Sequence, residues 1–284
     1  MATVLGATHS VPVGLGVAAA VARHPAAMAM ELATLGGAFP GRVMAGLGHG
    51  VPAWVQQMGL QPRSVLRSLR EAGTAIRELL DGDEVTQDGE YFTFDHVRLL
   101  RPPTTRVPLY FGIHGPRSLE LSGELADGTL LGWFSSPDYV AWARERIDEG
   151  RRRAGRSDHH TVVALCIASI SESDPMAARR ELAEWAGPRL VDMAGSPEMI
   201  ATEAGRAIGA LVQDRGAQAV GRDLPFEVLD EFVAAGNASA CARMARRLLN
   251  AGADRVALVP NPAGLRTTDS MVDQIRAAAT LLHD

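Results

Sequence analysis

The chain contains no lysine, because all 28 of its basic residues are arginine. This absence excludes a Schiff-base lysine and the lysine of a phosphate-binding P-loop. Only two cysteines are present, Cys166 and Cys241, and they lie too far apart for a C-x-x-C metal site. A dense disulfide framework is therefore excluded, and a reducing cytoplasm is the expected location.

Long apolar runs and a charge excess of one sign are also missing. No stretch reaches the roughly 18 apolar residues that a membrane span needs, and the N-terminus lacks the pattern of a signal peptide. The net charge is −5. The short basic run Arg151–Arg153 falls at the end of a predicted helix, where it complements the helix dipole. We therefore expect neither a membrane nor a nucleic acid as a partner.

The 284 residues are 46% hydrophobic and 21% charged, values that suit one soluble domain with a sizeable core. Short apolar runs alternate with longer helical patterns, which favours an α/β fold with a parallel sheet and right-handed crossovers. Six strands are predicted, at residues 11–17, 42–48, 107–113, 128–134, 161–170 and 254–260. Helices are predicted at 25–38, 64–82, 116–126, 137–153 and 270–283, with a hairpin around Asp88–Gly89. A long helical section is predicted at 174–249, with an interruption around 216–226. The periodicity alone suits either an open doubly wound sheet or six strands of a barrel.

Four segments resemble a known family: GLGVAAAVARHPAAMAMELATL (14–35), PGRVMAGLGHG (40–50), VPLYFGIHGPRSLELSGELADGTLL (107–131) and NAGADRVALVP (250–260). They are similar to the luciferase-like superfamily, and within it to the deazaflavin-dependent reductases akin to methylenetetrahydromethanopterin reductase. The resemblance implies a TIM-barrel-like (β/α)8 fold as a single domain over 1–284, with insertions near 83–106 and 171–236. Members usually begin with two further β/α units. The six strands would then be strands three to eight of an N-terminally truncated barrel, with a helical insertion before the last strand.

Two glycine-rich turns follow predicted strands, where the active site of such a barrel is expected. In Gly46–Gly50 the glycines leave room for a ligand, and His49 can donate or transfer a proton near neutral pH. In Gly112–Arg117 a strand runs into a helix with proline at its first position, and free amides at a helix start favour anions. The alternative is that both are ordinary turns. Asp127–Gly128 is interpreted as structural.

The resemblance also implies which residues act. A non-prolyl cis peptide is expected within Leu15–Val17, where the backbone would lie against a flavin-like ring; the alternative is an ordinary strand end. Arg266, after the last strand, is a candidate phosphate ligand or a surface residue. The expected catalytic residues are His49 and His114. The expected cofactor-binding residues are Leu15, Gly16, Val17, Gly48, Gly50, Gly112, Ile113, Gly115, Pro116, Arg117 and Arg266, and no metal site is expected.

The function that this resemblance implies is hydride transfer between reduced coenzyme F-420, a deazaflavin, and a small organic substrate. The coenzyme would supply the hydride chemistry and the protein the positioning. Two alternatives stay open: an FMN-dependent luciferase-like monooxygenase, and a non-catalytic flavin-binding homologue that lacks the first strands. A homodimer is expected from the habit of the family.

Overall fold

The computed structural model describes residues 1–261, apart from the side chains of residues 197 and 198. The predicted helix at 270–283 and the candidate ligand Arg266 lie outside this part of the chain. The described residues form two compact units. The first comprises 1–113, 117–130 and 146–160, and the second comprises 114–116, 131–145 and, among the described residues, 161–261.

The first unit is built on parallel strands. β3 (Val43–Gly48) pairs with β1 (Val13–Gly14), β2 (Ala18–Ala19) and β6 (Leu109–Gly112), and β6 pairs with β7 (Gly128–Leu131). Five of the six residues of β3 are buried, and the first three residues of β6 are buried as well. Such nearly continuous apolar burial is typical of a parallel sheet that is covered on both faces.

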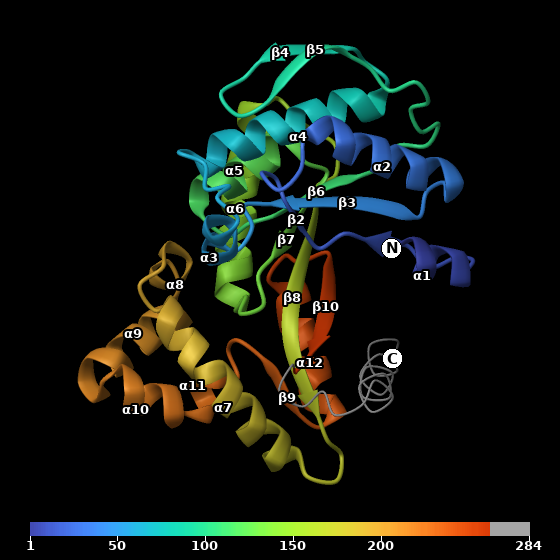
Figure 1. The fold of residues 1–284 in the computed structure, drawn as a ribbon. Coiled ribbons are helices and arrows are strands. Elements are labelled where there is room, and N and C mark those ends of the chain that lie inside the picture. Colours follow the sequence, from blue (N-terminus) through green and yellow to red (C-terminus); the bar gives the residue numbers. More distant parts are fainter. Residues whose placement is uncertain (262–284) are drawn as a thin grey trace. The chain divides into compact units, whose positions relative to one another are not determined.

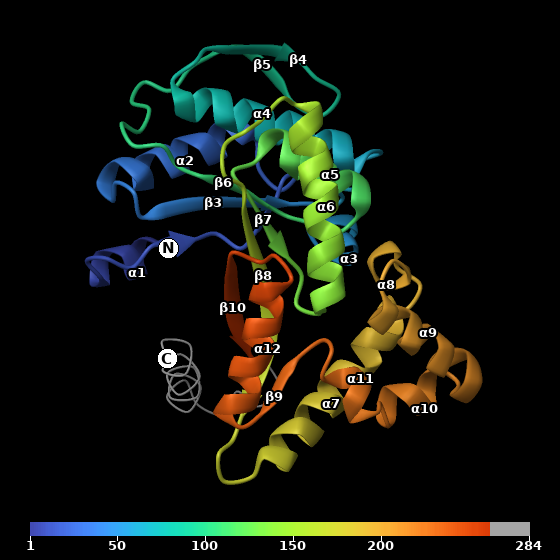
Figure 2. The ribbon, with the colours of Figure 1, turned by 180° about the vertical axis from the view of Figure 1, so that it is seen from behind.

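Helices α2 (Pro25–Ala38) and α4 (Val65–Asp81) pack side by side against β3 (Figures 1 and 2). The sequence sets the bounds of α4: the Ser64 hydroxyl accepts from the Arg67 amide at 3.2 Å, and Gly82 ends the helix at φ +94°. The same unit holds α1 (Ala2–Ala7), α3 (Pro52–Gln57) and α5 (Pro116–Leu125), although the first residue of α5 is grouped with the second unit.

The predicted hairpin is confirmed as β4 (Val85–Asp88) and β5 (Thr93–Val97), which pair antiparallel. A buried carboxylate holds its tip to α4. Glu71 is 9% exposed and accepts hydrogen bonds from the backbone amides of Glu90 at 3.2 Å and Tyr91 at 2.9 Å. The ring of His24, at the start of α2, contacts Phe92 and Phe94 on the hairpin.

The strands of the second unit are also parallel. β8 (Thr161–Ile170) pairs with β10 (Arg255–Pro260) along its length and with β9 (Ala234–Gly236) near its end. Helix α12 (Ala238–Asn250) packs on β8 and β10. Between β8 and β9 lie α7 (Pro175–Met193), α8 (Pro197–Ile200), α9 (Glu203–Arg215), α10 (Ala217–Arg222) and α11 (Phe226–Leu229). Helix α6 (Pro137–Arg153) contributes residues to both units.

This helical section before the last strand is the insertion that the sequence predicted. The structure differs from the prediction in several details: α3 was not predicted, and β7 ends at Leu131 rather than at residue 134. The strand predicted at 11–17 is split into β1 and β2, and β9 lies within the stretch predicted as helical.

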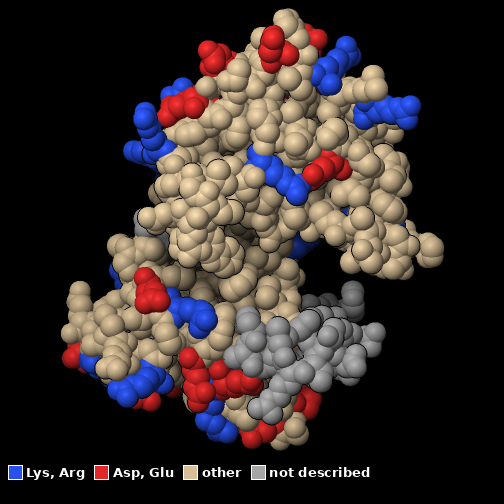
Figure 3. Space-filling model, viewed as in Figure 1, with Lys and Arg blue, Asp and Glu red and all other residues tan. Residues whose placement is uncertain are grey.

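In residues 1–261, no helix is both long and apolar enough to cross a lipid bilayer. On the face shown in Figure 3, acidic and basic side chains of the described residues are interspersed.

Candidate functional site

Three neighbouring strands of the first unit end at the same edge of their sheet. Gly48, the last residue of β3, is in register with Gly112, the last residue of β6, and Gly112 is in register with Leu130 of β7. The turns that follow β3 and β6 therefore leave one edge, as the sequence predicted. Ligands of parallel α/β folds bind at the carboxyl ends of the strands.

The segment between β1 and β2 bulges against this edge. The structure contains the expected non-prolyl cis peptide, between Gly16 and Val17. Beside it, the Leu15 carbonyl oxygen lies so close to Gly46 that a Cβ at Gly46 would be 1.7 Å from that oxygen. Glycine at position 46 thus makes room for the bulge.

The side chain of Val17 fills the space above two strand ends. A Cβ at Gly48 would lie 2.8 Å from a Val17 methyl carbon, and a Cβ at Gly112 would lie 2.6 Å from the other. Gly48 and Gly112 therefore accommodate Val17 rather than a ligand directly. The sequence predicted that these glycines leave room for a ligand, but the space above Gly48 and Gly112 is filled by Val17.

Gly16 has the opposite surroundings. A Cβ built at Gly16 would meet no atom within 4 Å, although its neighbours Leu15 and Val17 pack tightly against the sheet. Bare backbone is therefore presented to open space at this strand edge. Such a surface lets a flat ring approach the main chain closely, which a side chain would prevent.

His49 joins the two predicted turns. Its Nε2 atom lies 2.8 Å from the Oγ atom of Ser118, in the first turns of α5, and the pair is partly buried. Next to it, Gly50 has φ +77°, and a Cβ there would be 2.7 Å from the Ala19 side chain. Glycine is thus required for the turn that positions His49. Ser118 was not among the residues expected from the sequence.

The other predicted residues of the described chain lie just after β6, in the turn that leads into α5 and in the first residues of α5. Ile113 continues β6, and its amide donates to the Leu130 carbonyl at 3.3 Å. Arg117 is exposed at the start of α5. His114, Gly115 and Pro116 belong to the second unit, where the His114 carbonyl accepts a hydrogen bond from Tyr139 at 2.9 Å.

Asp127 anchors the opposite, amino-terminal end of β6. One carboxylate oxygen accepts from the Leu109 amide at 2.7 Å, and the group pairs with Arg77 and with Arg106. Burial alone would raise the pKa of Asp127, but the charge of Arg77 and these hydrogen bonds outweigh it and lower the pKa. Asp127 therefore has the structural role that the sequence indicated.

No group of three or more histidine, cysteine or acidic side chains is arranged to hold a metal ion within the described part of the chain. The chemistry available in the first unit is thus an open backbone at Gly16, a partly buried imidazole with a hydroxyl partner, and the exposed guanidinium of Arg117. These groups can bind and orient a planar ligand, and His49 can exchange a proton.

Comparison with known proteins places this arrangement in a family. A 5,10-methylenetetrahydromethanopterin reductase of Methanolobus tindarius is 30% identical over 256 residues, which cover 88% of this chain and 77% of the relative. An F-420-dependent glucose-6-phosphate dehydrogenase of Microbacterium testaceum is 35% identical over 178 residues. This match covers 60% of the chain and 53% of the relative, so the chain matches about half the length of that protein.

A solved structure gives the fold. An F-420-dependent secondary alcohol dehydrogenase, in complex with an F-420–acetone adduct, matches 100% of this chain and 83% of its own chain with a TM-score of 0.78 at 23% identity. The α/β fold of the luciferase-like barrel enzymes, predicted from the sequence, is thereby confirmed. Residues 1–255 match the family described as luciferase-like monooxygenase, and the chain therefore belongs to that family.

Proposed function

We propose that this protein is an oxidoreductase that transfers a hydride between reduced coenzyme F-420 and a small organic substrate. The observation that carries the proposal is the open backbone at Gly16 beside the Leu15–Val17 bulge, at the strand edge where His49 lies. The relatives support the choice of coenzyme, since the dehydrogenases that resemble the chain are named as F-420-dependent.

The residues of the first unit fit a flat deazaflavin ring. A Cβ at Gly16 would occupy open space that the ring can fill, and Val17 closes the sheet behind it against Gly48 and Gly112. When bound, the coenzyme supplies the hydride chemistry. The bulge provides a fixed wall of backbone and aliphatic side chain, so the protein's part is to position the ring and to exclude water.

His49 is proposed to hold or deliver a proton at its imidazole. The Ser118 hydroxyl, 2.8 Å from Nε2, fixes the orientation of the ring. A hydroxyl can donate or accept, so the pair accommodates an imidazole that carries its proton on either nitrogen. The proposed binding residues of the second unit, His114, Gly115 and Pro116, are assigned by the resemblance and by the favourable field at the start of a helix.

Titration of the purified chain with each coenzyme tests this proposal. Coenzyme F-420 is expected to bind at least tenfold more tightly than FMN, as followed by the fluorescence of each ring. Tighter binding of FMN would favour the monooxygenase alternative. Binding of F-420 with no turnover of a panel of alcohols, sugar phosphates and pterins would favour the non-catalytic alternative.

The proposal extends to assembly and location. We propose a homodimer, in keeping with the family resemblance. We also propose a location in the cytoplasm, in keeping with two buried, free thiols at Cys166 and Cys241. Burial raises the pKa of each thiol to about 12, which keeps both unreactive near neutral pH. Light scattering after size exclusion would give the mass, and a monomer at micromolar concentration would contradict the dimer.

A further inference from the structure

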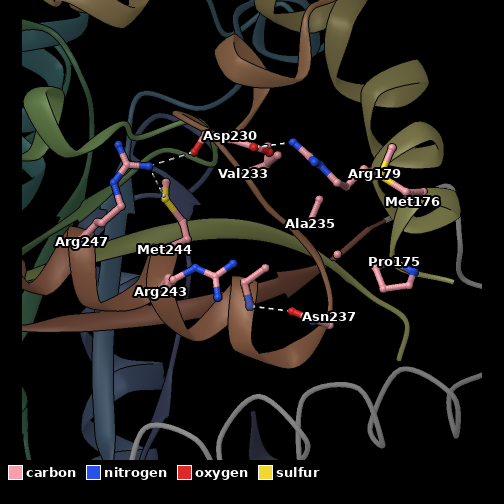
Figure 4. Close-up of a pocket in the computed structure, with 12 residues that line it drawn as sticks. Pro175, Met176, Arg179, Asp230, Val233, Ala235, Asn237, Arg243, Met244 and Arg247 are labelled. Atoms are coloured by element: carbon pink, nitrogen blue, oxygen red, sulfur yellow. Dashed lines mark hydrogen bonds and ion pairs between the residues drawn. The ribbon is translucent and has the colours of Figure 1, made fainter. Parts of the chain in front are cut away.

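The second unit contains a cavity of 380 Å³ between α7 and α12. Its floor is the buried segment that leads through β9, with Val233, Ala235 and Gly236 in the lining. Figure 4 shows side chains from the two helices around it, with Arg179 on α7 and Arg243 and Arg247 on α12. The cavity lies within one unit and shares no residue with the candidate site above.

The charges of the lining favour an anion. It contains three guanidinium groups and one carboxylate, Asp230, which gives a net charge of +2 in a chain whose net charge is −5. Arg243 and Arg247 are four residues apart, so they share one face of α12, where like charges repel. A bound anion would relieve this repulsion.

The three arginines differ in how many of their guanidinium donors have a hydrogen-bond or ion-pair partner in the protein. Arg247 pairs with Glu231, and Arg179 pairs with Asp230. The Nε atom of Arg179 is nevertheless buried without a hydrogen-bond partner among residues 1–261. Arg243 makes no hydrogen bond or ion pair with these residues either. The donors left for a ligand are therefore those of Arg243 and the Nη1 atom of Arg179, which makes no hydrogen bond with the described residues.

We propose that this cavity binds the phosphate group of a small molecule, with Arg243 and Arg179 as its principal ligands. Guanidinium donors match phosphate oxygens in pairs, and donors from two helices can reach a tetrahedral group from two directions. With Arg247 paired to Glu231 and Arg179 paired to Asp230, the free charge of Arg243 and the remaining donor of Arg179 suit an anion with several oxygens, such as a phosphate monoester. Met176 and Met244 in the lining provide apolar, adaptable contacts for the organic part of the ligand.

The proposal is independent of the coenzyme, so it can be tested on the purified full chain without it. Inorganic phosphate is titrated calorimetrically at constant ionic strength, with acetate as the carboxylate probe. Saturable binding of phosphate, at least tenfold tighter than that of acetate, is expected. Arg243→Gln is expected to weaken phosphate binding at least tenfold.

Arg180→Gln is the matched control. Arg180 lies next to Arg179 on α7 and is exposed, but it does not line the cavity. The Arg180→Gln substitution removes one positive charge from the same unit, as Arg243→Gln does, and is expected to change the affinity for phosphate less than twofold. Circular dichroism melts establish that both variants fold. The proposal is overturned if phosphate does not saturate the protein, if acetate binds as well, or if the two variants weaken binding equally.

Discussion

The Nε2 atom of His49 and the Oγ atom of Ser118 lie 2.8 Å apart, although the two residues are 69 positions apart in the sequence. The pair links the turn after β3 to the helix that follows β6. Because β3 and β6 are hydrogen-bonded neighbours that end in register, the two elements meet at one edge of the sheet. The geometry thus brings a titratable group to the place where the family resemblance predicts a coenzyme.

Removal of the imidazole should weaken coenzyme binding without unfolding the chain. His49→Ala is expected to raise the Kd for F-420 about fivefold to tenfold, the effect of one lost hydrogen bond of about 1 kcal/mol. Ser118→Ala, which leaves the imidazole but frees its orientation, should have a smaller effect in the same direction. Fluorescence titration measures both. Thr34→Ala, on the exposed side of α2, is the control, and an unchanged Kd for His49→Ala would remove His49 from the site.

A substitution at Gly16 should change the affinity for the coenzyme without changing the stability of the fold. A Cβ at this position would enter open space, so Gly16→Ala is expected to leave the free energy of unfolding nearly unchanged. If the ring of the coenzyme lies against this backbone, the added methyl group should weaken F-420 binding at least tenfold. Denaturation and fluorescence titration of the same preparation give both quantities. A variant that binds F-420 as well as the parent chain would place the ring elsewhere.

A substitution at Gly46, in contrast, should lower the stability of the fold. A Cβ there would overlap the Leu15 carbonyl oxygen, and backbone cannot move aside as a flexible side chain can. Gly46→Ala is expected to destabilise the chain by at least about 1–3 kcal/mol, the range for overpacking. Gly37→Ala, in α2 with no atom within 4 Å, should instead stabilise by about 0.5–1 kcal/mol. Urea denaturation compares them, and equal stability of the two variants would contradict the packing described.

Much of the fold could be predicted from the spacing of apolar residues, because a helix or strand that buries one face needs apolar residues at a regular local interval. The predicted helix at 25–38 and the strand at 161–170 have the bounds of α2 and β8. β9 was missed because its sequence, Ala-Ala-Gly, has neither β-branched residues nor alternation. The break between β1 and β2 depends on contact with Gly46, some 30 residues away. Ser118 was missed for the same reason: only tertiary packing sets its neighbour.

Asp127 should make stability depend on pH. Its pKa is lowered in the folded state, chiefly by the Arg77 charge acting against burial, so the folded state binds the proton less readily than the unfolded chain. The stabilisation is therefore full above the unfolded pKa of about 3.9 and is lost as the pH falls through the lower folded pKa. Asp127→Asn should destabilise at pH 7 by about 1–3 kcal/mol and much less near pH 2. Urea midpoints at several pH values test this, and a pH-independent difference would contradict it.

Glu71 should control the order of the hairpin tip. Its carboxylate accepts from two backbone amides, at Glu90 and Tyr91, while it is almost fully buried. Glu71→Gln turns one acceptor into a donor that faces an N–H group, so a buried amide is left unsatisfied at a cost of about 1–3 kcal/mol. Faster hydrogen exchange of those two amides is expected, with the sheet amides of β3 unaffected. Glu31→Gln, at an exposed ion pair, should change neither; equal protection of the tip in both variants would show that the ring contacts of His24 suffice to hold it.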